Sequence, residues 1–199
     1  MSIKLVWAVI TQRAPRSDYK VEDLDIEVSN NALNQVVSYL PANLSSLRHF
    51  TIRSTWDFPP HSLDSLVIAF VDSDHLHTLR LVAGASTALT PHPIFPLPDT
   101  AFPLLPHLGI LDLSGTHEMT LPRLSLIASS CADLKDLLLG DARWSVRPTD
   151  FVSAADGEVA SPGEREIVTS LSRLEKLRRV CLGRLPIEMW EAKELRPFG

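Results

Sequence analysis

The sequence contains few cysteines, no excess of basic residues and no long apolar run, and each shortage argues against a class of protein. Cys131 and Cys181 lie 50 residues apart without a CxxC or Cys/His pattern, so free thiols in a reducing compartment are expected. The 19 lysines and arginines are scattered along the chain and outnumbered by 24 aspartates and glutamates. A nucleic-acid partner is therefore not expected, because a phosphate backbone calls for a basic patch.

The distribution of apolar residues argues against a membrane or secreted location. No apolar run approaches the roughly 20 residues that a helix needs to span a bilayer. Only six apolar residues separate Lys4 from Thr11, which is fewer than the about 7 to 15 of a secretion signal. The expected location is the cytoplasm or the nucleus, with no membrane partner.

Sequence signatures of catalysis are missing as well. The chain has no P-loop, GxGxxG, GxSxG or HExxH pattern. His75 and His77 flank Leu76, but zinc would need further ligands that the nearby sequence does not supply in a recognised spacing. We therefore expect no catalytic residues, no cofactor and no metal. An enzyme whose site is assembled from distant residues is the remote alternative.

Leucine, in contrast, is abundant, with 31 of the 199 residues. The stretch CADLKDLLLGD, residues 131–141, fits either a helix or the end of a buried strand by its leucine spacing. Its residues Leu134, Leu137 and Leu139 form an apolar frame, LxxLxL, that recurs with conservative replacements. The other frames are VEDLDI, LRHFTI, LHTLRL, LGILDL and LRRVCL, which begin at residues 21, 47, 76, 108 and 177.

The spacing of the frames is that of an irregular repeat. Successive frames begin 26, 29, 32, 26 and 43 residues apart, and three of these intervals fall within the about 20 to 29 residues of a leucine-rich repeat. Insertions account for the two long intervals. Residues 90–106 contain six prolines and are expected not to sustain a helix. Residues 141–164 are polar and rich in turn residues, which is typical of a loop.

A helical pattern separates the frames. Apolar residues spaced i, i+3, i+4 and i+7 predict helices around residues 33–40, 63–70 and 124–131. A last helix is predicted over Ile167 to Leu174, and Ser161-Pro162-Gly163-Glu164 before it has the order of a capping box with proline at the first helical position. Each predicted repeat is thus a strand followed by a helix.

The segment LIASSCADLKDLLLGD, residues 126–141, spans a helix that ends at Cys131 and a strand that begins near Leu134. It resembles the repeats of F-box/leucine-rich-repeat proteins that pair a helix ending in cysteine with a strand. LSSLRHFTIRS, residues 44–54, and LPHLGILDLSG, residues 105–115, resemble the irregular repeats of the large fungal group of F-box-like proteins. The resemblance covers roughly residues 20–185.

The resemblance implies an α/β fold, a short right-handed leucine-rich-repeat solenoid of five to six irregular strand–helix repeats. Neighbouring repeats bury one another's apolar faces, and their strands form a parallel sheet on the concave side. We expect a single domain over residues 1–199. Its strands are expected near residues 21–28, 47–54, 76–83, 108–115, 134–141 and 177–184, followed by a C-terminal cap or tail at residues 185–199.

An F-box precedes the repeats in the family members that act in ubiquitin ligases, but only about 20 residues precede the first frame here. Residues 185–190, LPIEMW, have the Leu-Pro-x-Glu form that opens an F-box, yet they follow the repeats, where a closing helix is expected. A Skp1-type linker is therefore not expected as a partner without an F-box. The alternative is that the chain is the substrate-recognition part of an F-box-type ubiquitin ligase adaptor.

The alternation of strand residues predicts a binding surface on the concave face. Its mixed polarity suits a protein or peptide partner, so a non-catalytic interaction module is the expected function. Arg53 and Arg80 are expected to contribute most to affinity. The expected binding residues are Asp23, Asp25, Glu27, His49, Thr51, Arg53, Thr78, Arg80, Asp112, Asp136 and Arg179.

Two tryptophans follow predicted strands and lie next to or near an arginine in the sequence. Trp56 and Trp144 are candidates for interface anchors at the edge of the loops. The alternative is that they cover the end of the core. Cys181 falls on the predicted exposed side, where its thiol is either reactive or partly covered.

Overall fold

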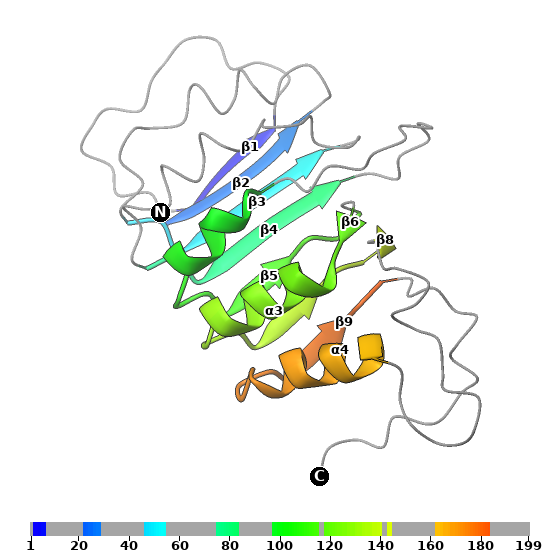
Figure 1. The fold of residues 1–199 in the computed structure, drawn as a ribbon. Coiled ribbons are helices and arrows are strands. Elements are labelled where there is room, and N and C mark those ends of the chain that lie inside the picture. Colours follow the sequence, from blue (N-terminus) through cyan, green and yellow to red (C-terminus); the bar gives the residue numbers. More distant parts are fainter. Residues whose placement is uncertain are drawn as a thin grey trace.

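The computed structural model describes residues 2–6, 22–28, 46–54, 75–83, 97–115, 118–140, 143–144 and 162–183. Within these residues the central element is a seven-stranded sheet in which all neighbouring strands are parallel (Figure 1). Its strands are β1 (Ser2–Val6), β2 (Asp23–Val28), β3 (His49–Ser54), β4 (Thr78–Ala83), β5 (Ile110–Asp112), β7 (Asp136–Leu138) and β9 (Arg179–Cys181). Their order across the sheet is their order along the chain. The expected α/β class with a parallel sheet is therefore confirmed.

The register of the sheet aligns the apolar positions of the LxxLxL frames. One row across β2, β3, β4, β5 and β7 consists of Leu24, Phe50, Leu79, Leu111 and Leu137. These side chains are at most 5% exposed. Because strand residues alternate between the two faces of a sheet, this row defines the core side and places the residues between the frame positions on the other side.

A hydrogen-bond pattern recurs where the chain enters successive strands. The backbone N–H groups of Arg48 and His49 both donate to the carbonyl of Glu22, at 2.8 and 3.0 Å. Those of His77 and Thr78 donate in the same way to the carbonyl of Arg48, at 2.8 and 2.9 Å. The same paired arrangement continues at the carbonyls of His77, Gly109 and Lys135. Each strand entry is thus fixed to the preceding one by the same geometry.

Two α-helices occupy predicted positions. Helix α3 (Leu121–Ser130) begins after Thr120, whose hydroxyl accepts a hydrogen bond from the Arg123 N–H at 3.3 Å. This contact satisfies one of the N–H groups that a helix start leaves without a partner. The helix ends at Cys131, whose N–H donates to the carbonyl of Ile127 at 2.9 Å. Helix α4 (Pro162–Ser172) begins at the proline of the capping pattern.

The expectation that the proline-rich stretch sustains no helix was wrong for its last part. Residues Asp99–Leu104 form a 3₁₀ helix, η1, with Pro103 inside it. Proline fixes φ near the helical value and loses only one backbone donor, and a short 3₁₀ segment tolerates that loss because few of its N–H groups are bonded within it. Phe102 of η1 is fully buried, and this packing holds the segment on the sheet.

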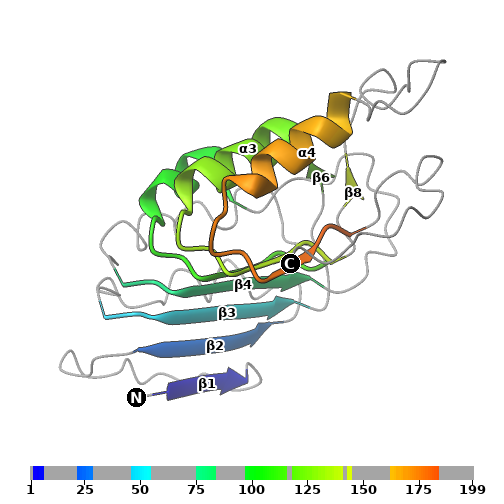
Figure 2. The ribbon, with the colours of Figure 1, turned by 90° about the horizontal axis from the view of Figure 1, so that it is seen from below.

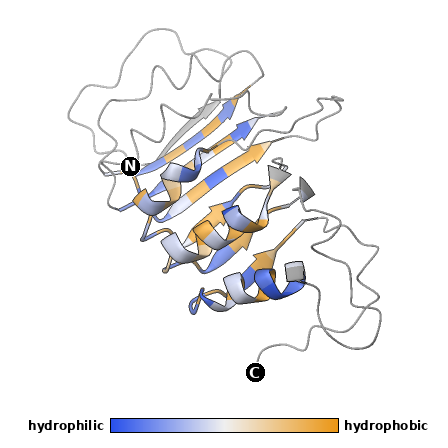
Figure 3. Ribbon diagram, viewed as in Figure 1, coloured by the Kyte–Doolittle hydropathy of each residue, from blue (hydrophilic) through white to orange (hydrophobic). Residues whose placement is uncertain are grey.

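The helices lie on one face of the sheet. Figure 2 shows α3 and α4 side by side above the strands. Leu124, Ile127 and Ala128 of α3 are at most 3% exposed and belong to the same core cluster as the inward strand residues. In Figure 3, strands β2 to β4 alternate between hydrophobic and hydrophilic residues. The apolar set lies on the same side of the sheet as the described helices, and the polar set lies on the face that no described helix covers.

The last frame is less buried than expected. Leu177, Val180 and Leu182 were predicted to fill the core, but Val180 is 43% exposed and the other two are partly buried. Among the described strands, β9 lies at the edge of the sheet and pairs with β7 alone. Its apolar side chains therefore have a described neighbouring strand on one side only.

Three described strands were not expected. Strand β1 pairs in parallel with β2 and places Ile3 and Leu5 opposite Leu24 and Ile26. Strands β6 (Glu118–Met119) and β8 (Arg143–Trp144) form a separate two-stranded parallel sheet. The predicted helices at residues 33–40 and 63–70, Val21 of the first frame, and the predicted cap or tail at residues 185–199 lie outside the described residues.

Candidate functional site

The predicted binding residues lie in three rows on the polar face of the sheet. The register places Asp25 of β2 opposite Thr51 of β3, which lies opposite Arg80 of β4 and then Asp112 of β5. A second row consists of Asp23, His49, Thr78, Ile110, Asp136 and Arg179. The third row begins with Glu27 and Arg53. The sheet therefore brings all eleven predicted binding residues onto one face.

The charges on this face are unevenly distributed. Strand β2, next to the first strand of the sheet, carries Asp23, Asp25 and the exposed Glu27 on this face. Arginines follow on the next two strands, Arg53 on β3 and Arg80 on β4. A partner that matches this face therefore needs basic groups toward β2 and acidic groups toward β4.

Arg53 is paired within the face. Its Nη1 atom donates to both carboxylate oxygens of Asp25, at 2.6 and 2.8 Å. This hydrogen bond raises the pKa of Arg53, with further contributions from the charges of Asp25, Glu27 and Asp112. The guanidinium thus remains charged, but one of its nitrogens is already used. The sequence gives no sign of this ion pair, because Asp25 and Arg53 are 28 residues apart in the chain.

Arg80 has a different environment. Its side chain is half-buried in the middle of the face, between Thr51 and Asp112 in the register. The Nε atom is buried and has no hydrogen-bond partner among the described residues. A buried donor without a hydrogen-bond partner costs free energy.

Three further charged residues of the face, Asp112, Asp136 and Arg179, have local partners. Arg179 of β9 donates from Nη2 to Asp136 of β7 at 2.8 Å. Asp112 accepts from both the backbone N–H and the hydroxyl of Ser114, at 3.1 and 2.6 Å. These contacts hold the two aspartates in fixed orientations. The carboxylates of Asp112 and Asp136 are therefore already engaged in contacts within the face and are less available for an ion pair with another molecule.

Thr78 departs from its predicted exposure. Its side chain is only 5% exposed, whereas an outward strand position was expected to be accessible. The Nδ1 atom of His49 lies 2.9 Å from the Thr78 hydroxyl, within hydrogen-bond distance. In the register Thr78 stands between His49 and Ile110, two larger side chains. A small residue between larger neighbours is covered by them, so Thr78 positions His49 and does not contact a partner directly.

Trp144 covers the core and is not an exposed anchor. Its side chain is 8% exposed, and its Nε1 atom donates to the carbonyl of Leu182 at 2.6 Å. A buried indole with its N–H bonded is a structural element that ties β8 to the end of β9. Of the two interpretations that the sequence allows for Trp144, its burial supports coverage of the end of the core. Trp56 lies outside the described residues.

The two thiols have contrasting environments. Cys131 is fully buried at the end of α3. Burial raises the pKa of its thiol to about 12, because a thiolate is poorly solvated there. Cys181, on the polar face, is exposed. Only the second thiol is accessible to reagents from solution.

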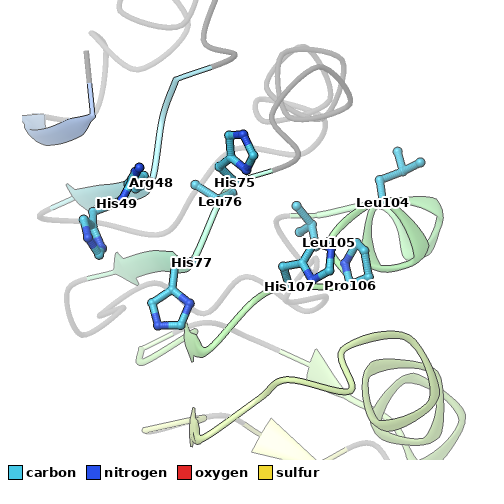
Figure 4. Close-up of a pocket in the computed structure, with 9 residues that line it drawn as sticks. All are labelled: Arg48, His49, His75, Leu76, His77, Leu104, Leu105, Pro106 and His107. Atoms are coloured by element: carbon cyan, nitrogen blue, oxygen red, sulfur yellow. The ribbon is translucent and has the colours of Figure 1, made fainter. Parts of the chain in front are cut away.

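A pocket opens at the edge where the strands begin. Its volume is about 700 Å³, and it is lined by Arg48, His49, His75, Leu76, His77, Leu104, Leu105, Pro106 and His107 (Figure 4). Three segments far apart in the sequence thus contribute four imidazoles. The sequence drew attention to His75 and His77 alone, because the register that adds His49 and His107 depends on the parallel sheet.

A charged cluster adjoins this pocket. Asp133 accepts hydrogen bonds from Lys176 and lies 3.2 Å from Nδ1 of His107. Hydrogen bonds from Lys176 and then from His107 lower the pKa of Asp133. These contacts connect the segments before β5, β7 and β9. They are exposed, so their contribution to stability depends on pH and salt.

Three further findings bear on function. The residues that the structure describes contain no group of three or more histidine, cysteine, aspartate or glutamate side chains placed to hold a metal ion. None of the described helices has the length and apolar character needed to cross a membrane. No protein-family model matches the chain, and no curated protein matches it.

Proposed function

We propose that the chain is a short leucine-rich-repeat solenoid that binds a protein or peptide on the polar, concave face of its sheet. The strands follow one another in sequence order, and the LxxLxL positions share one register. The paired hydrogen bonds at each strand entry recur from Glu22 to Lys135. Such regularity supports a stack of repeats that presents an extended surface.

Arg80 is the observation that carries the binding proposal. Its buried Nε lacks a hydrogen-bond partner among the described residues, and it lies at the centre of the charged rows. A guanidinium offers donors in a planar fork that fits a carboxylate. We therefore place an acidic side chain of the partner on Arg80 and a basic group of the partner near Glu27, which is exposed.

The test compares three bait proteins in affinity purification with quantitative mass spectrometry. They are the unaltered chain, Arg80→Gln, and Arg165→Gln as a matched control. Arg165 is exposed on α4, on the opposite side of the sheet. Proteins retained by the unaltered chain and the control but lost by Arg80→Gln are the expected partners.

Each such partner is then purified and its affinity measured by calorimetry. Arg80→Gln should weaken binding by at least about tenfold, as for a central arginine in an interface. Equal melting temperatures of the three baits show that folding is unchanged. Partner sets and affinities that do not differ between Arg80→Gln and Arg165→Gln would refute binding on this face.

A further inference from the structure

The histidine pocket is rich in nitrogen-bearing side chains. Four of the seven histidines of the chain lie around it together with Arg48, and none of the nine lining residues is acidic. Arginine is always charged, and each imidazole carries at least one ring N–H that can donate a hydrogen bond. In a chain of net charge -5, this local set of nitrogen donors is a favourable environment for an anion.

The imidazoles are held in place by packing. A side chain at Gly109 would meet the His77 ring, because a Cβ atom there would lie 2.2 Å from Cε1 of His77. The His77 ring in turn stands edge-on to the His49 ring, with 6.3 Å between their centroids. His49 is fixed by the Thr78 hydroxyl at 2.9 Å. The glycine and the buried threonine therefore make room for two oriented rings.

Acidic residues close to the pocket pair with two of its four imidazoles, those of His49 and His107. Asp23 lies 3.8 Å from Nε2 of His49, and Asp133 contacts His107. The rings of His75 and His77 form no hydrogen bond with any residue in the described part of the chain. Their nitrogen atoms are accordingly available to a ligand.

The opposite part of the lining is apolar. Leu76 and Leu105 are buried in its wall, and Leu104 is 39% exposed at η1. A volume of about 700 Å³ is in the range of small-molecule sites, which typically combine apolar walls with a few polar groups. The pocket is thus larger than an inorganic ion needs and has room for an apolar body.

We propose that this pocket binds a small organic phosphate, with the phosphate group on Arg48 and the histidines and an apolar body against the leucines. A phosphate has three terminal oxygens, which match a donor set drawn from several segments better than the two oxygens of a carboxylate. The site lies at the strand entries and is distinct from the Arg80 position on the polar face. Loss of one activity therefore does not entail loss of the other.

The test uses phenyl phosphate as the probe, with inorganic phosphate, benzoate and phenol as matched comparisons. Imidazole signals followed by NMR report binding and locate it. Phenyl phosphate should shift the signals of His75 and His77 and bind in the low millimolar range or tighter, more strongly than each comparison. Equal binding of benzoate would overturn the phosphate assignment. Equal binding of phenol, or no shift at all, would overturn the anion site.

Two variants and one control locate the contacts. Arg48→Gln should weaken phenyl phosphate binding by about tenfold or more, because it removes a charge-assisted hydrogen bond. Arg178→Gln is the control, since Arg178 donates its backbone N–H to Lys135 just as Arg48 does to Glu22, but lies outside the pocket. His77→Phe keeps a ring without nitrogen and should also weaken binding. Unchanged affinity in both Arg48→Gln and His77→Phe would refute the site.

Discussion

The guanidinium Nη1 of Arg53 on β3 lies 2.6 Å and 2.8 Å from the two carboxylate oxygens of Asp25 on β2. The two residues are diagonal neighbours, because the register pairs Asp25 with Thr51 and Glu27 with Arg53. Both side chains remain partly accessible, with 42% of Arg53 and 32% of Asp25 exposed. The pair links two adjacent strands on the polar face, whereas the buried Nε of Arg80 has no hydrogen-bond partner among the described residues.

The exposure of this pair limits its contribution to stability. A double-mutant cycle with Asp25→Asn and Arg53→Gln should give a coupling free energy of at most about 1 kcal/mol, as for other solvent-exposed ion pairs. Urea unfolding of the two single variants and the double variant measures it. A coupling of several kcal/mol would mean that the pair is desolvated, in conflict with its exposure.

The two cysteines should differ in reactivity. In the folded protein at pH 8, an aromatic disulfide reagent such as dithiobis(nitrobenzoate) should modify one thiol per chain rapidly and leave the second unmodified. Cys181 is exposed, whereas Cys131 is buried with a pKa of about 12 and so stays protonated at pH 8. The thiolate is the reactive form. Cys181→Ser should remove the rapid phase, and denaturant should make Cys131 react. Rapid modification of Cys131 in the folded protein would contradict its burial.

Gly115 is a position where a side chain should be strongly destabilising. Its φ angle is +73°, and a Cβ atom there would lie 2.0 Å from the carbonyl oxygen of Ala83. Gly115→Ala should lower the free energy of unfolding by more than the about 1 to 2 kcal/mol of the left-handed conformation alone, because the contact adds to it.

Gly115→Asn separates the two causes. Asparagine tolerates positive φ better than alanine does, but it carries the same Cβ. Urea unfolding should therefore show both variants well below the unaltered chain. An asparagine variant as stable as the glycine form would mean that the Ala83 carbonyl moves away, and that backbone strain is the only cost.

The sheet could be predicted from the sequence because its determinants are local. Burial on one side of a strand imposes a two-residue alternation, and the apolar frame around Leu24, Phe50 and Leu79 carried that alternation in each strand. Strand β1 was missed because residues 2–6 show only its alternation, through Ile3 and Leu5, without a complete frame. The short β6 and β8 have too few residues for any periodic signal.

The site was less predictable because its properties depend on neighbours across strands. The positions of Arg53 and Thr78 followed from alternation, but the Asp25 ion pair and the coverage of Thr78 depend on the side chains of adjacent strands. The pocket required His49, His77 and His107, which lie at or just before the starts of three different strands, to meet at one edge. The spacing of these histidines along the chain does not indicate that they lie close together in the fold.

Asp133 should make stability depend on pH in the acid range. Lys176 and His107 lower its pKa in the folded chain from an ordinary value of 3.8. A carboxylate with a lowered pKa stabilises the fold at pH values above its unfolded pKa, and this stabilisation is lost as the pH falls through the folded pKa. Asp133→Asn should therefore lower the urea midpoint at pH 7. The difference in urea midpoint between the variant and the unaltered chain should stay constant to about pH 5 and become smaller below pH 3.8.

Glu166→Gln provides the control for this measurement, since it also removes one negative charge but at an exposed position on α4. It separates the local contacts of Asp133 from the general effect of net charge on an acidic chain. Asp133→Asn should shift the midpoint at pH 7 more than Glu166→Gln does. Equal midpoints for the two variants across the whole pH range would show that the contacts of Asp133 with Lys176 and His107 do not persist in solution. In that case the edge of the pocket at His107 would be held by the packing of Leu105 and Leu108 alone, both of which are at most 2% exposed.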